Sequence, residues 1–348
     1  MIHFLFSLNI VWGILCVILY LLSGVDPHRF WLFSISSLII PISFAINVLF
    51  IFIWLFVKWR YGILSLLILL LGYGHIRKFF SLNEKNESSR CQTSSFRLMS
   101  FNLYGLKNTK DPSEQIQQSK KSQFLSFIRK TDPDILCVQE NNLFSDRILT
   151  ESGIFPYVHY MINHGTGIYS RYPILDQGLL DFGKNTNSCV WADIMVNGNR
   201  IRVYSTHLES NRITREVSKL RDDQPEESKQ KVGLIRDIFR KYRRMSIRRA
   251  EQANMIQEHA SQSPYPVVIA GDFNDTPYSY SYRILTNKRK DSFLERGFGI
   301  GTTYMGLIPG LRIDFILADE GPLNFCTHRV SQTPFSDHNP IMAEIFSK

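Results

Sequence analysis

The sequence predicts an α/β domain built from two β-sheets packed face to face, preceded by an N-terminal transmembrane anchor of apolar helices. Residues Ile2 to Tyr73 are almost continuously apolar, whereas the remainder has the mixed composition of a soluble domain. From residue 95 onwards, short apolar runs end repeatedly in polar residues, and only a few helical patterns fall between them. Many strands with few helices favour sheet-on-sheet packing. We therefore divide the chain into an anchor at 1–76, a polar linker at 77–94 and the α/β domain at 95–348.

The first two apolar segments each have the length of a membrane span. Ile2 to Leu22 contains no charged residue, and Phe30 to Val57 is longer and interrupted only by Pro41. A helix needs about 20 apolar residues to cross the hydrocarbon core. Buried helices of soluble proteins usually keep a polar face, which both segments lack. The first segment has no basic region before it and no small-residue cleavage site after it, so it does not resemble a signal peptide.

A third segment, Tyr61 to Tyr73, barely reaches spanning length and decides the side on which the α/β domain lies. Lys58 and Arg60 precede it, and the positive-inside rule places that loop in the cytoplasm. If the third segment spans, the domain is extracytoplasmic, and we favour this arrangement for an integral membrane protein. If it does not span, the domain is cytoplasmic, an alternative favoured by Arg77 and Lys78.

The charge composition of the chain after the anchor limits the kinds of partner that this part can bind. From residue 94 onwards, 33 Lys and Arg stand against 28 Asp and Glu. This mild basic excess fits a phosphate-rich partner, but it is too small for a dedicated nucleic-acid-binding domain. The five cysteines are too few for a disulfide framework and lack metal-ligand spacing.

Polar side chains recur where the predicted strands end. They are Asn102, Glu140, His207, Asp272, Asn274, Asp337 and His338. Strand ends gathered at one edge of packed sheets form a shared cleft. Oxygen and imidazole groups without a thiolate suit Mg²⁺ or Mn²⁺ rather than a structural zinc. A carboxylate-held metal beside a histidine is suited to the attack of water on phosphorus.

Asp314 is unusual because it lies inside an apolar strand, Leu311 to Leu317. Burying an unpaired carboxylate costs several kcal/mol. The position of Asp314 therefore predicts a specific polar partner.

These residues fall in six short motifs that resemble one known family. The motifs are Ser100-Phe101-Asn102, Val138-Gln139-Glu140, Ser205-Thr206-His207-Leu208, Gly271-Asp272-Phe273-Asn274, Arg312-Ile313-Asp314-Phe315 and Ser336-Asp337-His338-Asn339-Pro340. In this order they resemble the endonuclease/exonuclease/phosphatase superfamily, which includes pancreatic-type deoxyribonucleases, neutral sphingomyelinases and inositol-polyphosphate 5-phosphatases. The resemblance covers roughly residues 95 to 348. It implies two packed mixed β-sheets flanked by helices, a four-layer sandwich, with Mg²⁺ (or Mn²⁺) at the sheet edge.

The resemblance also implies a metal site. Glu140 would be the principal ligand, with Asn102 beside it and Asp337 facing the metal region. Some family members carry an acidic residue two positions after the first Asn, where this sequence has Tyr104. The sequence therefore leaves open whether the site holds one metal ion or two.

The other matched residues would carry the chemistry. Asp272 would orient or deprotonate the attacking water, and Asn274 would hold a phosphate oxygen. His338 would stabilise the charge on phosphorus or act as the acid–base group, with Asp314 fixing its tautomer. His207 would bond to the scissile phosphate; the abasic-site endonucleases have Tyr at this position, which argues against that activity.

Three functions remain open at this stage. The first is a membrane-anchored, Mg²⁺-dependent hydrolase of a phosphodiester or phosphomonoester, with a lipid headgroup among the substrates. The second is a membrane-tethered nuclease. The third is a non-catalytic interaction module, which is disfavoured because every expected catalytic position is filled. Fold alone cannot supply the substrate, and the sequence leaves the oligomeric state open.

A basic helical segment lies at 229–249, between the His207 and Asp272 motifs. It holds nine Lys and Arg against Asp237 alone. Ile235, Ile238, Phe239 and Tyr242 recur with helical spacing and form one apolar face. The segment is either a helix packed on the domain with a solvated basic face, or a surface helix that contacts anionic lipid headgroups or a polyanionic substrate beside the active site.

Overall fold

The computed structural model describes residues 1–83, 94–106, 114–161, 163–183, 187–210, 228–306 and 310–347. The chain forms two compact units. The first contains Met1–Ser81, Asn211–Ala250 and Asp275–Arg283, and the second contains Leu82–Ser210, Glu251–Asn274 and Ile284–Lys348. Two insertions of the α/β domain therefore group with the anchor. The predicted domain boundaries stay predictions, and most of the predicted linker at 77–94 lies outside the described residues.

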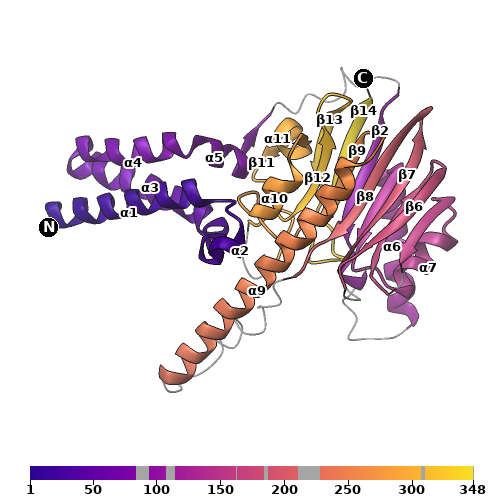
Figure 1. Cartoon of the computed structure of the whole chain (residues 1–348), viewed down its shortest axis with the longest axis horizontal. Helices are drawn as coiled ribbons and strands as arrows, with labels where there is room; N and C mark the ends of the chain where they lie inside the picture. Colours follow the sequence, from indigo (N-terminus) through magenta and orange to yellow (C-terminus); the bar gives the residue numbers. More distant parts are fainter. Residues whose placement is uncertain are drawn as a thin grey trace. The chain divides into compact units, whose positions relative to one another are not determined.

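The secondary structure follows the order in Figure 1. The helices are α1 (Ile2–Leu22), α2 (Pro27–Phe30), η1 (Trp31–Ile35), α3 (Ser36–Val57), α4 (Trp59–Leu71), α5 (Tyr73–Phe79), η2 (Tyr104–Leu106), α6 (Glu114–Thr131), α7 (Leu143–Glu151), α9 (Ser228–Ser261), α10 (Tyr280–Leu285) and α11 (Ser292–Arg296). The strands are β1 (Ser81–Leu82), β2 (Phe96–Asn102), β3 (Ile135–Gln139), β4 (Tyr157–Met161), β5 (Thr166–Ser170), β6 (Ile174–Asp181), β7 (Ser188–Val196), β8 (Asn199–His207), β9 (Val267–Asp272), β10 (Arg289–Asp291), β11 (Phe298–Gly299), β12 (Asp314–Asp319), β13 (Leu323–Val330) and β14 (Ile341–Ser347).

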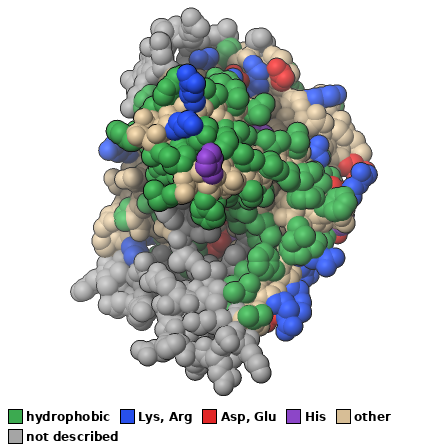
Figure 2. All heavy atoms as spheres, turned by 90° about the vertical axis from the view of Figure 1, so that its left-hand side faces the viewer, with side chains coloured by type: hydrophobic (Ala, Val, Ile, Leu, Met, Phe, Trp, Pro, Cys, Tyr) green, Lys and Arg blue, Asp and Glu red, His purple; other side chains and the backbone are tan. Residues whose placement is uncertain are grey.

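The anchor contains helices that are apolar enough to cross a membrane. In the described part of the chain, Ile2–Leu22 and Pro27–Val57 meet the length and hydropathy of a span. Trp59–Leu71 and Tyr73–Phe79 meet them together, as a pair bent by 66°. Hydrophobic side chains crowd the face of the molecule drawn in Figure 2. Exposed apolar side chains of this kind are unfavourable in water and suit a lipid environment.

Side-chain pairs define the directions of the anchor helices. Phe6 of α1 stacks on Tyr61 of α4 with the ring centroids 4.1 Å apart, and further along both helices Ser65 Oγ donates to Asn9 Oδ1 at 2.9 Å. The two helices therefore run in the same direction. Because Phe6 also meets Trp54, which is near the end of α3, α3 runs in the opposite direction.

Two six-stranded sheets form the framework of the second unit (Figure 1). One has the strand order β10-β12-β9-β8-β7-β6, and the other has the order β13-β14-β2-β3-β5-β4. Each sheet contains one parallel pair, β8 with β9 and β2 with β3, among antiparallel neighbours. The predicted fold class, two packed mixed sheets flanked by helices, is confirmed.

A core of aliphatic side chains fills the space between the sheets. Leu98 and Cys137 from one sheet join Val203, Val268 and Ala270 from the other in one fully buried cluster. Side chains alternate between the two faces of a strand, so Met99 and Leu136 face the other way. The apolar runs seen in the sequence thus bury both faces of their sheets.

Helices cover the outer faces and complete four layers. Phe124 and Ile128 of α6 pack with Leu149 of α7 in a second buried cluster, against the β2–β3 sheet. The C-terminal part of α9 covers the other sheet, where Tyr204 of β8 bonds to His259 with Oη and Nδ1 2.7 Å apart.

Gly271 lets β8 and β9 approach closely at the edge that matters for function. Its φ is +149°, and a Cβ there would lie 1.9 Å from the carbonyl oxygen of Thr206. Any larger residue would therefore push the two strands apart. Glycine at this position allows His207 and Asp272, the last residues of β8 and β9, to pair in register.

Candidate active site

The strand ends bring the predicted polar residues to one edge of the two sheets. Asn102 ends β2 and Glu140 follows β3, and these parallel strands end side by side. His207 and Asp272 end the parallel pair β8 and β9 in the facing sheet. Parallel strands place their carboxyl ends at the same edge, which explains why residues far apart in sequence meet here.

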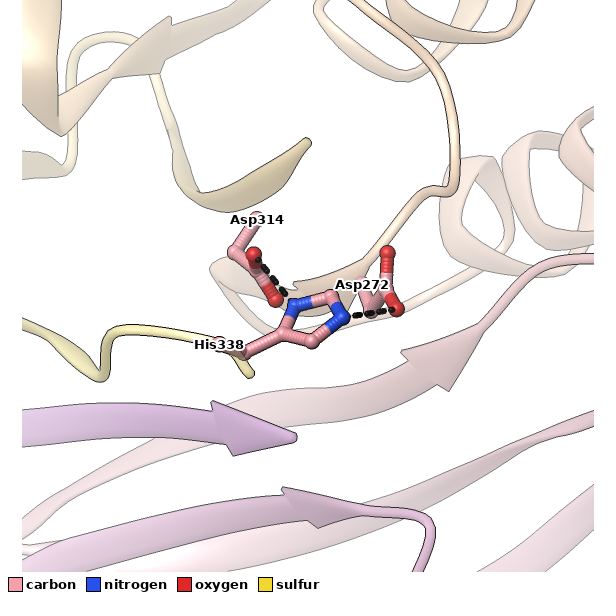
Figure 3. Close-up of side chains that lie close together, drawn as sticks. All are labelled: Asp272, Asp314 and His338. Atoms are coloured by element: carbon pink, nitrogen blue, oxygen red, sulfur yellow. Dashed lines mark hydrogen bonds and ion pairs between the residues drawn. The ribbon is translucent and has the colours of Figure 1, made fainter. Parts of the chain in front are cut away.

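A buried imidazole lies between two buried carboxylates at this edge (Figure 3). His338 Nδ1 is 3.0 Å from Asp314 Oδ2, and His338 Nε2 is 3.7 Å from Asp272 Oδ2. Asp314 starts β12 and pairs in register with Asp272 of β9, so the sheet itself sets the spacing of the two acids. The sequence expectation that Asp314 needs a polar partner is met by His338.

The two carboxylates determine the charge of His338. Burial would by itself lower the pKa of the imidazole, but the charges of Asp314 and Asp272 and the hydrogen bond to Asp314 raise it to about 10. The imidazolium form is therefore favoured at neutral pH. Such a cation can stabilise negative charge that develops on a substrate.

Neighbouring side chains hold this group in place, and the sequence motifs did not predict all of them. Thr303 Oγ1 accepts hydrogen bonds from the backbone N–H groups of Ile313 and Asp314. The ring of Tyr304 lies 5.1 Å from that of His338. Both residues precede the Asp314 motif in a stretch without a recognisable pattern, so only the backbone pairing of Tyr304 with Leu311 and His338 brings them here.

Asp272 accepts several hydrogen bonds. Asn102 Nδ2 donates to Asp272 Oδ2 at 2.9 Å, and the backbone N–H of Asn274 donates to Oδ1 at 2.8 Å. Burial raises the pKa of Asp272, opposed by the charge of His338. Asn274 Nδ2 donates to Leu208 O at 3.0 Å, so in this arrangement its amide group braces the site.

Glu140 is the most open acid at the edge. Its side chain is 36% exposed, and its φ of +47° is uncommon for a residue other than glycine. Asn102 Nδ2 lies 3.5 Å from Glu140 Oε1, while Asn102 Oδ1 accepts from the backbone N–H of Tyr104. Asn102 thus lies beside Glu140 as expected, but its amide nitrogen, not its oxygen, faces the carboxylate.

Unpaired buried atoms suggest what the site binds. Among the described residues, neither ring nitrogen of His207 has a hydrogen-bond partner, although Nε2 lies 3.9 Å from Glu140 Oε1. Asp337 Oδ1 is also buried without a partner in the described structure. Burial raises the pKa of Asp337, the charge of His338 opposes this rise, and the charges of Glu140 and Asp272 add to it. Unpaired carboxylate oxygens fit a cation, and an unpaired imidazole N–H fits an anion such as phosphate.

Asp272, Asp314 and His338 form a tight cluster, but it is not the most open place for a metal. One ligand atom from each lies within 4.8 Å of the others. The Asp314–His338 hydrogen bond already satisfies two of these atoms. Asp337 Oδ1, which is buried without a partner among the described residues and lies near the charges of Glu140 and Asp272, is a better candidate to hold a cation.

Comparisons with known proteins agree with this geometry. Residues 99–338 match the Endonuclease/Exonuclease/phosphatase family, and residues 2–79 match a domain of unknown function. No curated protein matches the chain.

Several solved structures share the fold. Humanized D. rerio TDP2 is 16% identical, with a TM-score of 0.54 over 73% of this chain and 100% of that one. An endonuclease/exonuclease/phosphatase from Bacteroides vulgatus is 19% identical, with a TM-score of 0.53 over 74% and 100%. The human Nocturnin catalytic domain, crystallised with a bound sulfate anion, is 16% identical, with a TM-score of 0.52 over 74% and 96%. The chain belongs to the endonuclease/exonuclease/phosphatase family and is a hydrolase of the phosphoesterase or nuclease type.

Proposed function

We propose that this protein is a membrane-anchored, Mg²⁺-dependent hydrolase that cleaves phosphate esters at a membrane surface. The observation that carries the proposal is the buried Asp314–His338–Asp272 group beside the open carboxylate of Glu140. A fixed cation can stabilise charge that develops on phosphorus, and a neighbouring carboxylate can orient the attacking water. Positioning and charge stabilisation provide most of the rate enhancement in phosphoryl transfer.

Each of the polar residues at the site has a separate role in the proposed reaction. His338, held as an imidazolium by Asp314, stabilises the negative charge of the transition state. Asp272, whose pKa is raised by burial, orients the attacking water and accepts its proton. His207, with its unpaired ring nitrogens, donates to a phosphate oxygen. Asn274 keeps Asp272 in position through its backbone N–H, and its side chain is free to turn towards a phosphate oxygen once it leaves Leu208.

The metal residues fit a hard divalent cation. Glu140 and Asp337 would hold it, with Asn102 positioning Glu140, and substrate and water would fill the remaining positions. Bound there, Mg²⁺ or Mn²⁺ would supply Lewis-acid polarisation of the phosphate.

A cavity that Tyr304 and Asn339 help to line favours a substrate larger than phosphate, because the ring of Tyr304 packs near His338 and Asn339 follows His338 in the chain. Its volume is about 870 Å³, and its lining includes Tyr304, Met305 and Asn339 as well as Phe298 and Arg296. Polar and apolar side chains are both present, which suits an organic group attached to the phosphate. The protein would therefore bind the ester through both its phosphate and its organic part.

The direct experiment is a panel of substrates given to the full-length protein in vesicles. A bis-aryl phosphate, an aryl monophosphate, phospholipids of the same vesicles and plasmid DNA would each be tested with Mg²⁺. We expect hydrolysis of the bis-aryl phosphate and of a phospholipid, both abolished by EDTA. No hydrolysis of any ester with Mg²⁺ or Mn²⁺ would contradict the proposal.

A membrane-tethered nuclease is the second candidate. D. rerio TDP2, one of the structures that share the fold, was crystallised with a single-strand DNA product. Cleavage of plasmid DNA without cleavage of phospholipid in the same panel would favour this function. Binding of a phosphate ester without turnover would instead favour a non-catalytic interaction module.

Contacts within the first unit help to decide on which side of the membrane the catalytic domain lies. Arg283 Nε donates to the carbonyl oxygen of Gly24 at 2.9 Å, and Tyr242 Oη donates to that of Ser34 at 3.0 Å. Gly24 and Ser34 lie between helices α1 and α3, Gly24 after the first candidate span and Ser34 in the first part of the second, Pro27–Val57. The insertions that carry Arg283 and Tyr242 are therefore at the membrane side where this stretch emerges.

The end of the third apolar segment meets the same insertions. Tyr278 Oη donates to the carbonyl oxygen of His75 at 3.1 Å, and His75 itself contacts Ser23. A chain that crosses twice would leave His75 on the side opposite Ser23, so these contacts favour three spans. We propose that the catalytic domain is extracytoplasmic, with Lys58 and Arg60 on the cytoplasmic side.

Reporter fusions test this topology. A reporter that is active only after export should be active when it is fused after Lys348. The matched fusion after Arg60, behind two spans, should be active only with a cytoplasmic reporter. If only the cytoplasmic reporter is active after Lys348, the catalytic domain is on the other side.

A further inference from the structure

The first part of α9 exposes an apolar strip along one side of the helix. Val232, Ile235 and Phe239 have side chains that are 66%, 44% and 43% exposed. They lie three to four residues apart, which places them on one side of a helix with 3.6 residues per turn. Large exposed apolar strips are uncommon on soluble surfaces and mark binding sites.

Arginines flank this strip. Arg236, Arg240, Arg243 and Arg244 are exposed, and Asp237 is the one acid between them. Because the helix has 3.6 residues per turn, the four arginines lie side by side around it, beginning at the edge of the apolar strip. The segment at Val232–Arg244 therefore has an apolar side next to a cationic side, the pattern of helices that lie in a membrane interface.

The same segment packs on the anchor in the first compact unit. Phe239 meets Trp31 edge to face with 6.5 Å between centroids, and Arg243 lies 5.8 Å from the centroid of the Trp31 ring. Trp31 belongs to the short link Asp26–Ile35 between the first two apolar helices. Phe30 and Leu32 of this link are also exposed, by 61% and 58%.

These contacts locate the helix along the membrane normal. The helix α3 alone has 22 residues, enough to cross the hydrocarbon core. We therefore place the link, most of which is the first part of the candidate span Pro27–Val57, where the chain leaves the hydrocarbon. Tyr242 Oη is within hydrogen-bond distance of Ser34 and Ser37 at the start of the second apolar helix. A helix attached at this level meets lipid headgroups through any side that faces away from the protein.

We propose that Val232–Arg244 lies in the interface of an anionic phospholipid bilayer. Val232, Ile235 and Phe239 enter the boundary between headgroups and acyl chains, and the arginines bind lipid phosphates. Through the contact of Phe239 with Trp31, the apolar strip adjoins a link that also exposes Phe30 and Leu32. The arginines are complementary to anionic headgroups. The inference rests on the proposed membrane anchoring, but not on catalysis.

Site-specific labels in the full-length protein test the proposal. A single environment-sensitive fluorophore would be attached to Phe239→Cys or Ile235→Cys, with Cys91 and Cys326 replaced by Ser. The protein would be placed in vesicles of phosphatidylcholine with phosphatidylglycerol, and quenching by lipid-bound and by water-soluble quenchers compared. We expect the lipid quencher to act on both labels and the soluble quencher to be excluded.

Two further labels serve as controls. Asp237→Cys lies on the opposite side of the same helix and should remain open to the soluble quencher. Ile14→Cys, exposed on α1, reports insertion of the anchor itself. If Ile14→Cys is in lipid while Phe239→Cys is in water, anchoring stands and this inference fails. If both labels are in water, the anchoring proposal fails.

Charge removal tests the lipid class. Arg236→Gln, Arg240→Gln and Arg244→Gln together should abolish lipid quenching at Phe239→Cys, whereas Arg243, which lies over Trp31, is kept. Salt of about 1 M, where the Debye length is about 3 Å, should weaken the contact in the unmodified helix. Equal quenching in vesicles of phosphatidylcholine alone would overturn the role of anionic lipid. Exclusion of both quenchers at Phe239→Cys would assign the strip to a second copy of the chain.

Discussion

Replacing Glu140 by Gln should lower Mg²⁺-dependent hydrolysis by at least about 10²-fold, the scale of a lost electrostatic group in an active site. The substitution keeps the size of the side chain and removes the charge at the most open acid of the site. Asn102 Nδ2 lies 3.5 Å from this carboxylate, and His207 Nε2 lies 3.9 Å from it. Initial rates on a bis-aryl phosphate, measured across Mg²⁺ concentrations, would reveal the loss.

The fold should survive this substitution because Glu140 is partly exposed and makes no ion pair with Lys or Arg among the described residues. Thermal unfolding should therefore be unchanged. The matched control is Glu151→Gln on α7, which removes only a surface pair with Lys121, worth at most about 1 kcal/mol. Full activity of Glu140→Gln in the presence of EDTA would refute the metal site.

Much of the fold was predictable because the spacing of apolar residues and the polar residues at strand ends can be recognised within short stretches of the sequence. Alternation in Phe96–Asn102 and a β-branched run before Asp272 require buried strands, and such strands pack in sheets. The spacing of the motifs then placed Asn102, Glu140 and Asp272 at one edge. The need of Asp314 for a polar partner could be anticipated because an unpaired buried carboxylate is costly, whereas His338 as that partner was implied by the family resemblance.

Other features depend on contacts between distant segments, and local pattern does not encode them. Thr303 and Tyr304 reach His338 through backbone pairing, which no motif of side chains marks. The orientation of the Asn102 amide follows from a hydrogen bond to Tyr104 N. The grouping of Asp275–Arg283 with the anchor results from single contacts such as Tyr278 with His75.

Asp275 follows Asn274 directly in the chain, so the loop that leaves the Asp272 motif is built into the anchor's compact unit. Arg249 binds Asp275 at 3.1 Å and is itself fully buried, which fixes the start of this loop.

Replacing Asp314 by Asn should slow hydrolysis by at least about 10²-fold because Asp314 positions and charges the imidazole that stabilises the transition state. His338→Ala should lose at least as much. The double variant should be no slower than His338→Ala alone, since Asp314 acts through His338 and effects within one unit are not additive. Values of kcat for the four proteins on one soluble ester would test this.

The pH dependence of kcat shows whether Asp314 positions and charges His338 or only stabilises the fold. Burial opposes protonation of His338, and the charge of Asp314 is the first influence that raises its pKa, to about 10. Removing that charge lowers the pKa, so the cation is lost at lower pH and the alkaline limb of kcat should move to lower pH. Asp193→Asn, a buried acid paired with Arg202 far from the sheet edge, should lower the unfolding temperature without moving that limb. If Asp314→Asn is slow with an unchanged limb, and the losses of the two single variants multiply in the double variant, Asp314 does not act through His338.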